Sequence, residues 1–149
     1  MNLIPNPFLR GDCFFCGASN PVGLKLAFYE AGTEPKEIIC RWTPPALYKG
    51  LGRILHGGIQ TGLFDEIMGW ATVHLTKGIG VTVDLKVIFL KPLFVEQEIE
   101  VRCRIESLEG HKVNLSAEIR NQEGTLCTNA TGTYLLMDEG RFKSLVGED

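Results

Sequence analysis

One segment with a helical hydrophobic period stands inside a chain whose other apolar residues mostly alternate. From Gly58 to about Leu75 the apolar residues recur every three or four positions, which is the period of an α-helix. They fall within one broad arc of the helical wheel: Ile59, Leu63, Ile67, Trp70 and Val73. On both sides of this segment the period is two, which is typical of β-strands. We therefore expect one long helix whose apolar arc is covered by a sheet.

The alternating segments are two before this helix and four after it. The first two cover residues 24–31 and 37–43, with a turn signal between them at Gly32 to Pro35. The later four cover residues 81–89, 95–108, 111–121 and 125–137, and the last three are joined by short Gly-containing turns suited to hairpins. In residues 81–89, Val81, Val83, Leu85, Val87 and Phe89 share one face. The order predicts an α+β domain in which a curved antiparallel sheet of about six strands wraps around one long central helix.

The chain of 149 residues fits a single domain. We expect an irregular lead-in over residues 1–23, the domain over residues 24–137 and a polar tail over residues 138–149. The net charge of −3, without clusters of Lys and Arg, argues against nucleic-acid binding. The sequence has no leader pattern and no run of about 20 apolar residues, so we expect a soluble, cytoplasmic protein without a membrane partner.

The start of the predicted helix carries the tripeptide His56-Gly57-Gly58. Glycine lets the backbone approach a ligand closely, and the first N–H groups of a helix have no partner within the helix. Such amides, at the positive end of the helix dipole, can stabilise an oxyanion that forms on a carbonyl. The alternative is that the glycines only permit a tight entry turn, and both interpretations remain open at this point.

Two adjacent carboxylates, Asp65 and Glu66, lie within the same helix. On the helical wheel Asp65 is close to Gly58, Gly62 and Gly69, so it borders a groove of missing side chains where a backbone or a thin ligand can approach. Glu66 lies about 100° away, inside the apolar arc. A carboxylate in such surroundings is a candidate general base or nucleophile, and the alternative is a paired structural acid or one that faces solvent.

The spacing of Gly57 and Asp65 limits how they can act together. Eight residues of helix separate them by about 12 Å, whereas two groups that act on one carbonyl carbon must converge within about 3–4 Å. If both act on the same carbonyl, two chains must supply them. A homodimer with antiparallel helices and two equivalent sites is the simplest such arrangement.

The five cysteines are an odd number, and most lie in strand-like segments, which favours reduced thiols over a disulfide framework. Cys13 and Cys16 form a CxxC pair. Zinc usually takes four ligands, and the sequence has no second CxxC or clustered pair of His. We therefore expect a tight turn at this pair and no metal site.

The motifs together resemble the hotdog-fold acyl-CoA thioesterases, in the branch typified by phenylacetyl-CoA thioesterase. The resemblance rests on "LHGGIQTGLFDEIMGWA" followed by "GVTVDLKVIFLKPL", and it covers roughly residues 13–137. The segments "CFFCGASNPVGLKL" and "YKGLGRILHGG" further resemble a bacterial subgroup of that family. One departure is Gly50, where family members often have Asn or Gln.

The resemblance implies hydrolysis of acyl-CoA thioesters at a dimer interface, with coenzyme A entering only as part of the substrate and no cofactor required. It assigns the oxyanion amide to Gly57, and the role of nucleophile or general base to Asp65 of the opposite subunit, with Glu66 as the alternative acid. It also implies that His56 positions the site and that Thr82 orients water.

Three further residues are expected to contact the substrate: Gly58, Gly62 and Trp70. The implied assembly is a homodimer, with a tetramer of two dimers as a further option. Two other activities stay open, a module that binds acyl-CoA without turnover and a hotdog dehydratase or hydratase, although the His-Phe-Pro context of the dehydratases is missing here.

Overall fold

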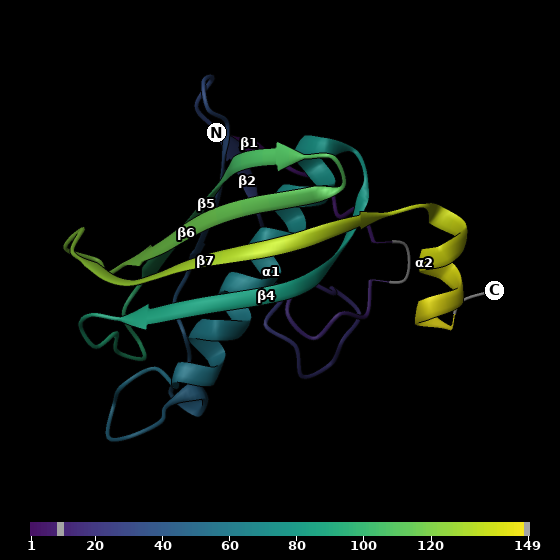
Figure 1. Cartoon of the computed structure of the whole chain (residues 1–149). Helices are drawn as coiled ribbons and strands as arrows, with labels where there is room; N and C mark the ends of the chain where they lie inside the picture. Colours follow the sequence, from purple (N-terminus) through teal and green to yellow (C-terminus); the bar gives the residue numbers. More distant parts are fainter. Residues whose placement is uncertain (9–10, 148–149) are drawn as a thin grey trace.

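The computed structural model describes residues 1–8 and 11–147 of the chain. A seven-stranded sheet and one long helix make up most of it (Figure 1). The strands are β1 (Asn2–Leu3), β2 (Tyr29–Ala31), β3 (Glu37–Trp42), β4 (Ile79–Phe89), β5 (Ile99–Glu109), β6 (Lys112–Arg120) and β7 (Leu126–Met137). The helices are α1 (Gly57–Thr76), α2 (Glu139–Val146) and a short 3₁₀ turn, Ala46–Tyr48.

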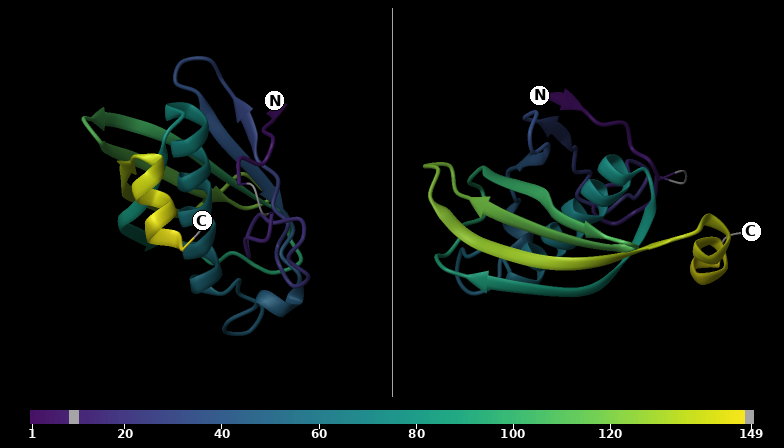
Figure 2. Two further views of the ribbon diagram at one scale, coloured as in Figure 1. Left: turned by 90° about the vertical axis from the view of Figure 1, so that its right-hand side faces the viewer. Right: turned by 45° about the horizontal axis from the view of Figure 1, so that its top comes forward.

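The strands are antiparallel and lie in the order β1-β2-β3-β5-β6-β7-β4. The sheet is curved, and α1 lies against its concave face (Figure 2). Buried side chains of α1, such as Phe64 and Ile67, pack on inward-facing residues of the central strands, such as Val101 and Leu115. This is the hotdog arrangement of one helix and one wrapped sheet, and it confirms the predicted fold class.

The sheet has seven strands where about six were expected, because the lead-in supplies β1 through pairing of Asn2 with Glu30 and Leu3 with Tyr29. The segment 24–31 forms a ladder only from Tyr29 onward. Before it, Lys25 has a positive φ of 54°, and the amides of Leu24 and Leu26 donate to the carbonyls of Phe14 and Phe15 in the lead-in. Leu24, Leu26 and Phe28 are nevertheless buried, as their alternation predicted. A second positive φ, 66° at Glu96, lies between the predicted start of the following strand and its observed start at Ile99.

Two further differences concern β4 and the C-terminal end. The β4–β7 register shifts between Thr82 and Asp84, so a bulge turns Val83 outward, to 58% exposure, away from the face it was expected to share. Residues 138–149 were predicted as a polar tail, and their described part contains α2, at whose start the Asp138 side chain accepts a hydrogen bond from the Arg141 amide. Neither helix is long and apolar enough to cross a membrane, within the described residues.

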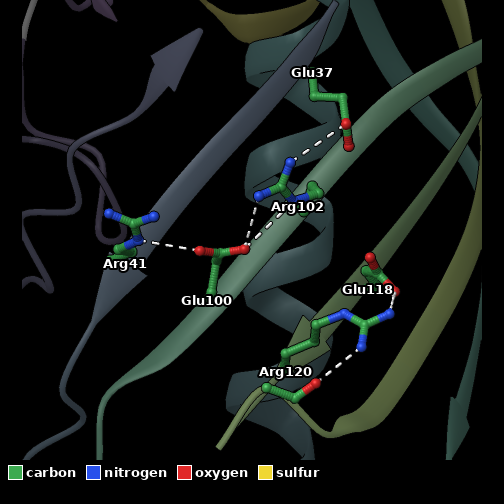
Figure 3. Close-up of polar contacts among 7 residues, drawn as sticks. Glu37, Arg41, Glu100, Arg102, Glu118 and Arg120 are labelled. Carbon is green, nitrogen blue, oxygen red and sulfur yellow. Dashed lines mark hydrogen bonds and ion pairs between the residues drawn. The ribbon is translucent and has the colours of Figure 1, made fainter. Parts of the chain in front are cut away.

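The outer face of the sheet carries rows of paired charges (Figure 3). Glu100 accepts hydrogen bonds from Arg41 at 3.0 Å and from Arg102 at 3.0 Å, and Arg102 also reaches Glu37 at 3.3 Å. Partial burial opposes ionisation of Glu100, but the two guanidinium groups outweigh it and lower the pKa of this carboxyl. This face therefore consists of compensated charges and differs from the apolar face that covers α1.

Candidate active site

The carboxylate of Asp65 projects from α1 toward the edge of the sheet, where two hydroxyl groups hold it. Thr82 Oγ1 on β4 and Tyr134 OH on β7 each donate to Asp65 Oδ1 at 2.6 Å. Tyr134 OH also lies 2.6 Å from the Asp65 carbonyl oxygen. Among the described residues no hydrogen bond uses Oδ2, and the Asp65 side chain is exposed. One oxygen is thus fixed and the other faces outward, as a general base or nucleophile requires.

The β4 bulge and the buried tyrosine explain why this carboxylate is held. The bulge at Val83 shifts the register, so that Thr82 pairs with Tyr134 and lies on the same face of the sheet. Regular alternation along β4 would place Thr82 on the other face. Burial, together with the hydrogen bond to Asp65, raises the pKa of the Tyr134 phenol. Tyr134 therefore stays protonated and remains a donor at any ordinary pH.

The N-terminus of α1 presents one free backbone amide beside His56, within the described residues. The His56 side chain is the N-cap, with Nδ1 accepting from the Gly58 amide at 2.8 Å. Within the described residues no hydrogen bond uses the Gly57 amide, the first of the helix. A cavity of about 360 Å³ opens at this end, lined by Leu47, Tyr48, Lys49, His56, Gly58 and Ile59. Gly57 does not itself line this cavity, but its neighbours His56 and Gly58 do, and a free amide at a helix N-terminus can donate to a carbonyl oxygen.

A buried polar contact fixes this end of the helix to the sheet. Gln60 is 3% exposed; its amide nitrogen donates to the Leu55 carbonyl at 2.9 Å, and its oxygen accepts from Thr128 Oγ1 on β7 at 2.6 Å. Both the nitrogen and the oxygen of the Gln60 amide are hydrogen-bonded, so burying this polar side chain leaves no unpaired group. The position of the Gly57 amide is therefore determined by the sheet as well as by the entry loop.

Gly57 and Asp65 both belong to α1, which runs without interruption from Gly57 to Thr76. Eight residues of helix place them about 12 Å apart along the axis. One chain therefore does not bring the free amide and the held carboxylate onto a single carbon.

The glycine groove beside Asp65 is largely filled by the chain itself. The ring of Phe15 packs on Gly62 so closely that a Cβ there would lie 2.2 Å from Phe15 Cζ. The missing side chain of Gly62 thus accommodates the lead-in, and the groove, which was predicted to admit a backbone or a thin ligand, is occupied by the Phe15 ring at this point. At Gly58 a Cβ would meet the His56 ring at 3.0 Å, so that glycine permits the cap.

Glu66 points away from Asp65, toward the lead-in. Its carboxylate accepts from Trp70 Nε1 at 3.2 Å and lies 3.5 Å from Cys13 Sγ. Trp70, expected to contact substrate, is 2% exposed and stacks on Phe28 with ring centroids 4.4 Å apart. Burial and the Glu66 carboxylate raise the pKa of the neighbouring Cys16 thiol. The two acids therefore have separate surroundings, and Asp65 is the one that faces outward.

Sequence reasoning did not identify Tyr134 or the Gln60–Thr128 pair. A tyrosine within an alternating apolar strand is usually a core residue. Only the fold brings Tyr134 into contact with Asp65, which is 69 positions earlier in the chain. A Gln on the apolar arc of a helix was the one available signal, because a buried amide needs partners.

Comparisons with known proteins place this arrangement in a family. Residues 52–128 match the family model described as "Thioesterase superfamily". The chain is 26% identical over 130 residues to acyl-coenzyme A thioesterase THEM4 of Bos taurus, covering 87% of this chain and 53% of that protein. The chain spans about half the length of the curated relatives it matches.

Solved structures share the fold. A protein from Streptococcus pneumoniae described as a hypothetical thioesterase, determined with coenzyme A, superposes with a TM-score of 0.67 at 19% identity, covering 74% of this chain and 88% of that one. The Escherichia coli PaaI protein from the phenylacetic acid degradation operon gives a TM-score of 0.64 at 18% identity, covering 68% and 73%. With a family model that matches from the helix entry loop to β7, and with this fold around it, the chain belongs to the thioesterase superfamily.

Proposed function

We propose that this protein hydrolyses acyl-CoA thioesters at two equivalent sites of a homodimer. Each site would combine the Gly57 amide of one subunit with Asp65 of the other. The observation that carries the proposal is the Asp65 carboxylate, which is exposed on α1 and held by two hydroxyl groups through one oxygen only. Membership of the thioesterase superfamily supports the reaction class.

Each group has a defined task in the hydrolysis. The free oxygen of Asp65 either removes a proton from the attacking water or attacks the thioester carbonyl itself. The negative charge that develops on the carbonyl oxygen is stabilised by the Gly57 amide at the positive end of the helix. In the general-base route the tetrahedral intermediate collapses, and the CoA thiolate leaves with the proton that Asp65 took from water. In the nucleophilic route the thiolate leaves behind a mixed anhydride between Asp65 and the acyl group; water then hydrolyses this anhydride, which releases the acid, supplies the proton for the thiolate and restores the carboxylate. His56 fixes the amide geometry through its cap on Gly58.

The surface next to the site supports the homodimer. Strand β4 is an edge of the sheet and spans 11 residues, and it exposes Val83, Ile88 and Phe89. A long edge with exposed apolar residues favours pairing with another strand. Twofold pairing through β4 would bring a second α1 in antiparallel orientation alongside the first, which the 12 Å separation requires.

The substrate class is supported by the entrance cavity and by the relatives. The cavity at the helix N-terminus includes Lys49, whose ammonium group suits the phosphates of coenzyme A. The bovine relative is named as an acyl-coenzyme A thioesterase, and the streptococcal structure contains coenzyme A.

The direct test is release of free CoA from a panel of acyl-CoAs, with Asp65→Asn compared with Glu66→Gln. We expect Asp65→Asn to lower kcat on the order of 10²-fold or more, since it removes the base but keeps the shape of the side chain. Glu66→Gln should stay within a few-fold of wild type. A wild type that binds acyl-CoA tightly but never releases CoA would instead identify a binding module. If only Glu66→Gln lost activity, the catalytic carboxylate would be Glu66, and the assignment to Asp65 would be wrong.

Sharing of the site between subunits is tested by complementation. Gly57→Pro removes the amide N–H, and Asp65→Asn removes the base. Mixed heterodimers of these two inactive variants contain one intact site, so about half the activity per heterodimer should return. No recovery after demonstrated subunit exchange would contradict the shared site.

A further inference from the structure

A second cluster of reactive side chains lies against α1, about 100° around the helix from Asp65. Cys13 and Cys16 of the lead-in and Glu66 of α1 bring two sulfur atoms and a carboxylate oxygen within 4.8 Å of one another. Cys13 Sγ lies 3.5 Å and 3.8 Å from the two oxygens of Glu66. Thiols are weak hydrogen-bond donors, so they compensate a half-buried carboxylate poorly.

The spacing of these atoms suits a tetrahedral divalent cation. With Zn–S bonds of about 2.3 Å and a Zn–O bond of about 2.0 Å, neighbouring ligand atoms in a tetrahedron are about 3.5–3.8 Å apart. The distances from Cys13 Sγ to the two oxygens of Glu66 already fall in this range, and a Cys16 ligand atom lies within 4.8 Å of the other two groups. Two thiolates and one carboxylate are a ligand set that zinc accepts, and a fourth position remains for water.

The lead-in is folded so that both cysteines face the helix. A tight turn joins the Gly17 amide to the Cys13 carbonyl at 2.8 Å, and no side chain fits at Gly17, where a Cβ would lie 2.4 Å from Cys13 N. Asn6 Nδ2 donates to the Cys16 carbonyl at 3.2 Å, and Phe15 is packed on Gly62. The turn expected for the CxxC pair is therefore present, and the helix supplies the third ligand that the sequence spacing did not contain.

The surroundings orient the carboxylate and give access to it. Trp70 Nε1 donates to Glu66 Oε1 at 3.2 Å, the kind of outer contact that fixes a metal-binding carboxylate. Cys13 and Glu66 line a cavity of about 370 Å³ between the lead-in, α1 and α2, whose wall includes Phe8 and Phe142. A hydrated cation can enter through this cavity and keep one water.

We propose that Cys13, Cys16 and Glu66 bind one Zn²⁺ ion per chain and thereby fasten the lead-in to α1. Binding displaces the two thiol protons, and the two thiolates and the carboxylate together neutralise the cation and leave one negative charge. The site is separate from Asp65 and does not depend on the hydrolytic activity. Its tests therefore use metal binding, in the absence of substrate, as the readout.

The experiment measures Zn²⁺ binding to the full chain kept reduced, by competition with a chromophoric chelator, and Co²⁺ binding by absorption. We expect one ion per chain and a thiolate-to-cobalt charge-transfer band. Loss of an outer contact alone lowers metal affinity about 10–100-fold, so Cys13→Ser and Glu66→Gln should lower it at least as much. Zn²⁺ should raise the Tm of the wild type and not that of these variants.

Two matched controls separate this site from adventitious binding. Cys127→Ala removes a thiol from β7, and Asp65→Asn removes the adjacent carboxylate; both should bind Zn²⁺ like wild type. Circular dichroism without metal checks that every variant is folded. Zn²⁺ affinity that is equal in wild type and Glu66→Gln, or no stoichiometric binding by reduced wild type, would overturn the proposal.

Discussion

At the scale of single residues, the proposed catalysis depends on two hydroxyl groups that hold one oxygen of Asp65. Tyr134→Phe keeps the buried ring and removes only the donor to Asp65. A hydrogen bond to a charged group contributes about 1.5–3 kcal/mol, so we expect kcat to fall about 10-fold or more. KM should change little, because the carboxylate acts on water or the carbonyl rather than on CoA. Steady-state kinetics with the best acyl-CoA measure both.

The control for this variant is Tyr29→Phe, which removes the hydroxyl of a half-buried tyrosine on β2. It should match wild type in kcat. Thr82→Val, which removes the second donor, should resemble Tyr134→Phe. A Tyr134→Phe enzyme with wild-type kcat would show that Asp65 does not need this contact.

At the residue scale, motifs in the sequence named residues for a candidate site, and the catalytic roles given to them stay predictions. Asp65 and Thr82, named from the sequence, lie in hydrogen-bond contact. Tyr134, Gln60 and the cluster around Glu66 were not predicted as partners because each contact joins segments far apart in the chain. Hydrophobic period shows which face of a helix is buried, but not which side chain from another element meets it.

At the scale of elements, the glycines of α1 have different tasks and should respond differently to the same substitution. A Cβ at Gly62 would lie 2.2 Å from Phe15, whereas one at Gly69 would meet only Tyr134 Cε2, at 4.0 Å. Ala is a better helix former than Gly by about 1 kcal/mol. Gly69→Ala should therefore raise the free energy of unfolding by up to about 1 kcal/mol. Gly62→Ala should lower it by about 1–3 kcal/mol through the steric conflict with Phe15.

Urea unfolding of both variants measures this difference. Gly62→Ala combined with Phe15→Ala should recover part of the loss if the conflict is with that ring, since the double variant removes the atom that clashes. Equal stability of Gly62→Ala and Gly69→Ala would contradict the packing of the lead-in on the helix.

Element boundaries could be predicted wherever period and turn signals agreed. The helix was predicted from Gly58 to about Leu75 and is observed over Gly57–Thr76. Strands β6 and β7 lie within the expected segments, and β5 extends one residue beyond its segment, to Glu109. The bulge at Val83 was not predicted, because alternation alone does not show where a strand gains an extra residue. Nor was α2 predicted, because its eight residues are mostly polar and none of their side chains is buried.

At the scale of the whole molecule, paired carboxylates on the outer face link stability to pH. The pKa of Glu100 is lowered from 4.5 because its contacts with Arg102 and Arg41 outweigh its partial burial. A carboxyl whose pKa is lower in the folded state adds stability above the unfolded pKa and loses it as pH falls through the folded pKa. The free energy of unfolding should therefore decrease as pH falls below about 4.5.

Glu100→Gln tests this dependence. It should be less stable than wild type at pH 7, by about 1 kcal/mol or less because the pair is partly exposed. The difference should shrink on acidification, since protonation removes the same charge from wild type. Glu98→Gln, in the exposed loop before β5, is the control. A stability difference between Glu100→Gln and wild type that is the same at pH 7 and in acid would contradict the assignment.

The largest-scale prediction concerns the free edge of the sheet at β4. Ile88 lies on this edge strand and is 44% exposed, and a lysine on an edge strand opposes strand pairing. Ile88→Lys should therefore shift the protein from dimer to monomer in analytical ultracentrifugation, while circular dichroism stays unchanged. Because Gly57 and Asp65 of one helix are about 12 Å apart, the folded monomer should also lose hydrolysis. Leu3→Lys, on the opposite edge strand β1 and 62% exposed, should leave both the dimer and the activity intact. A monomeric Ile88→Lys protein with full activity would mean that one chain forms a complete site, and it would remove the reason for pairing the two helices.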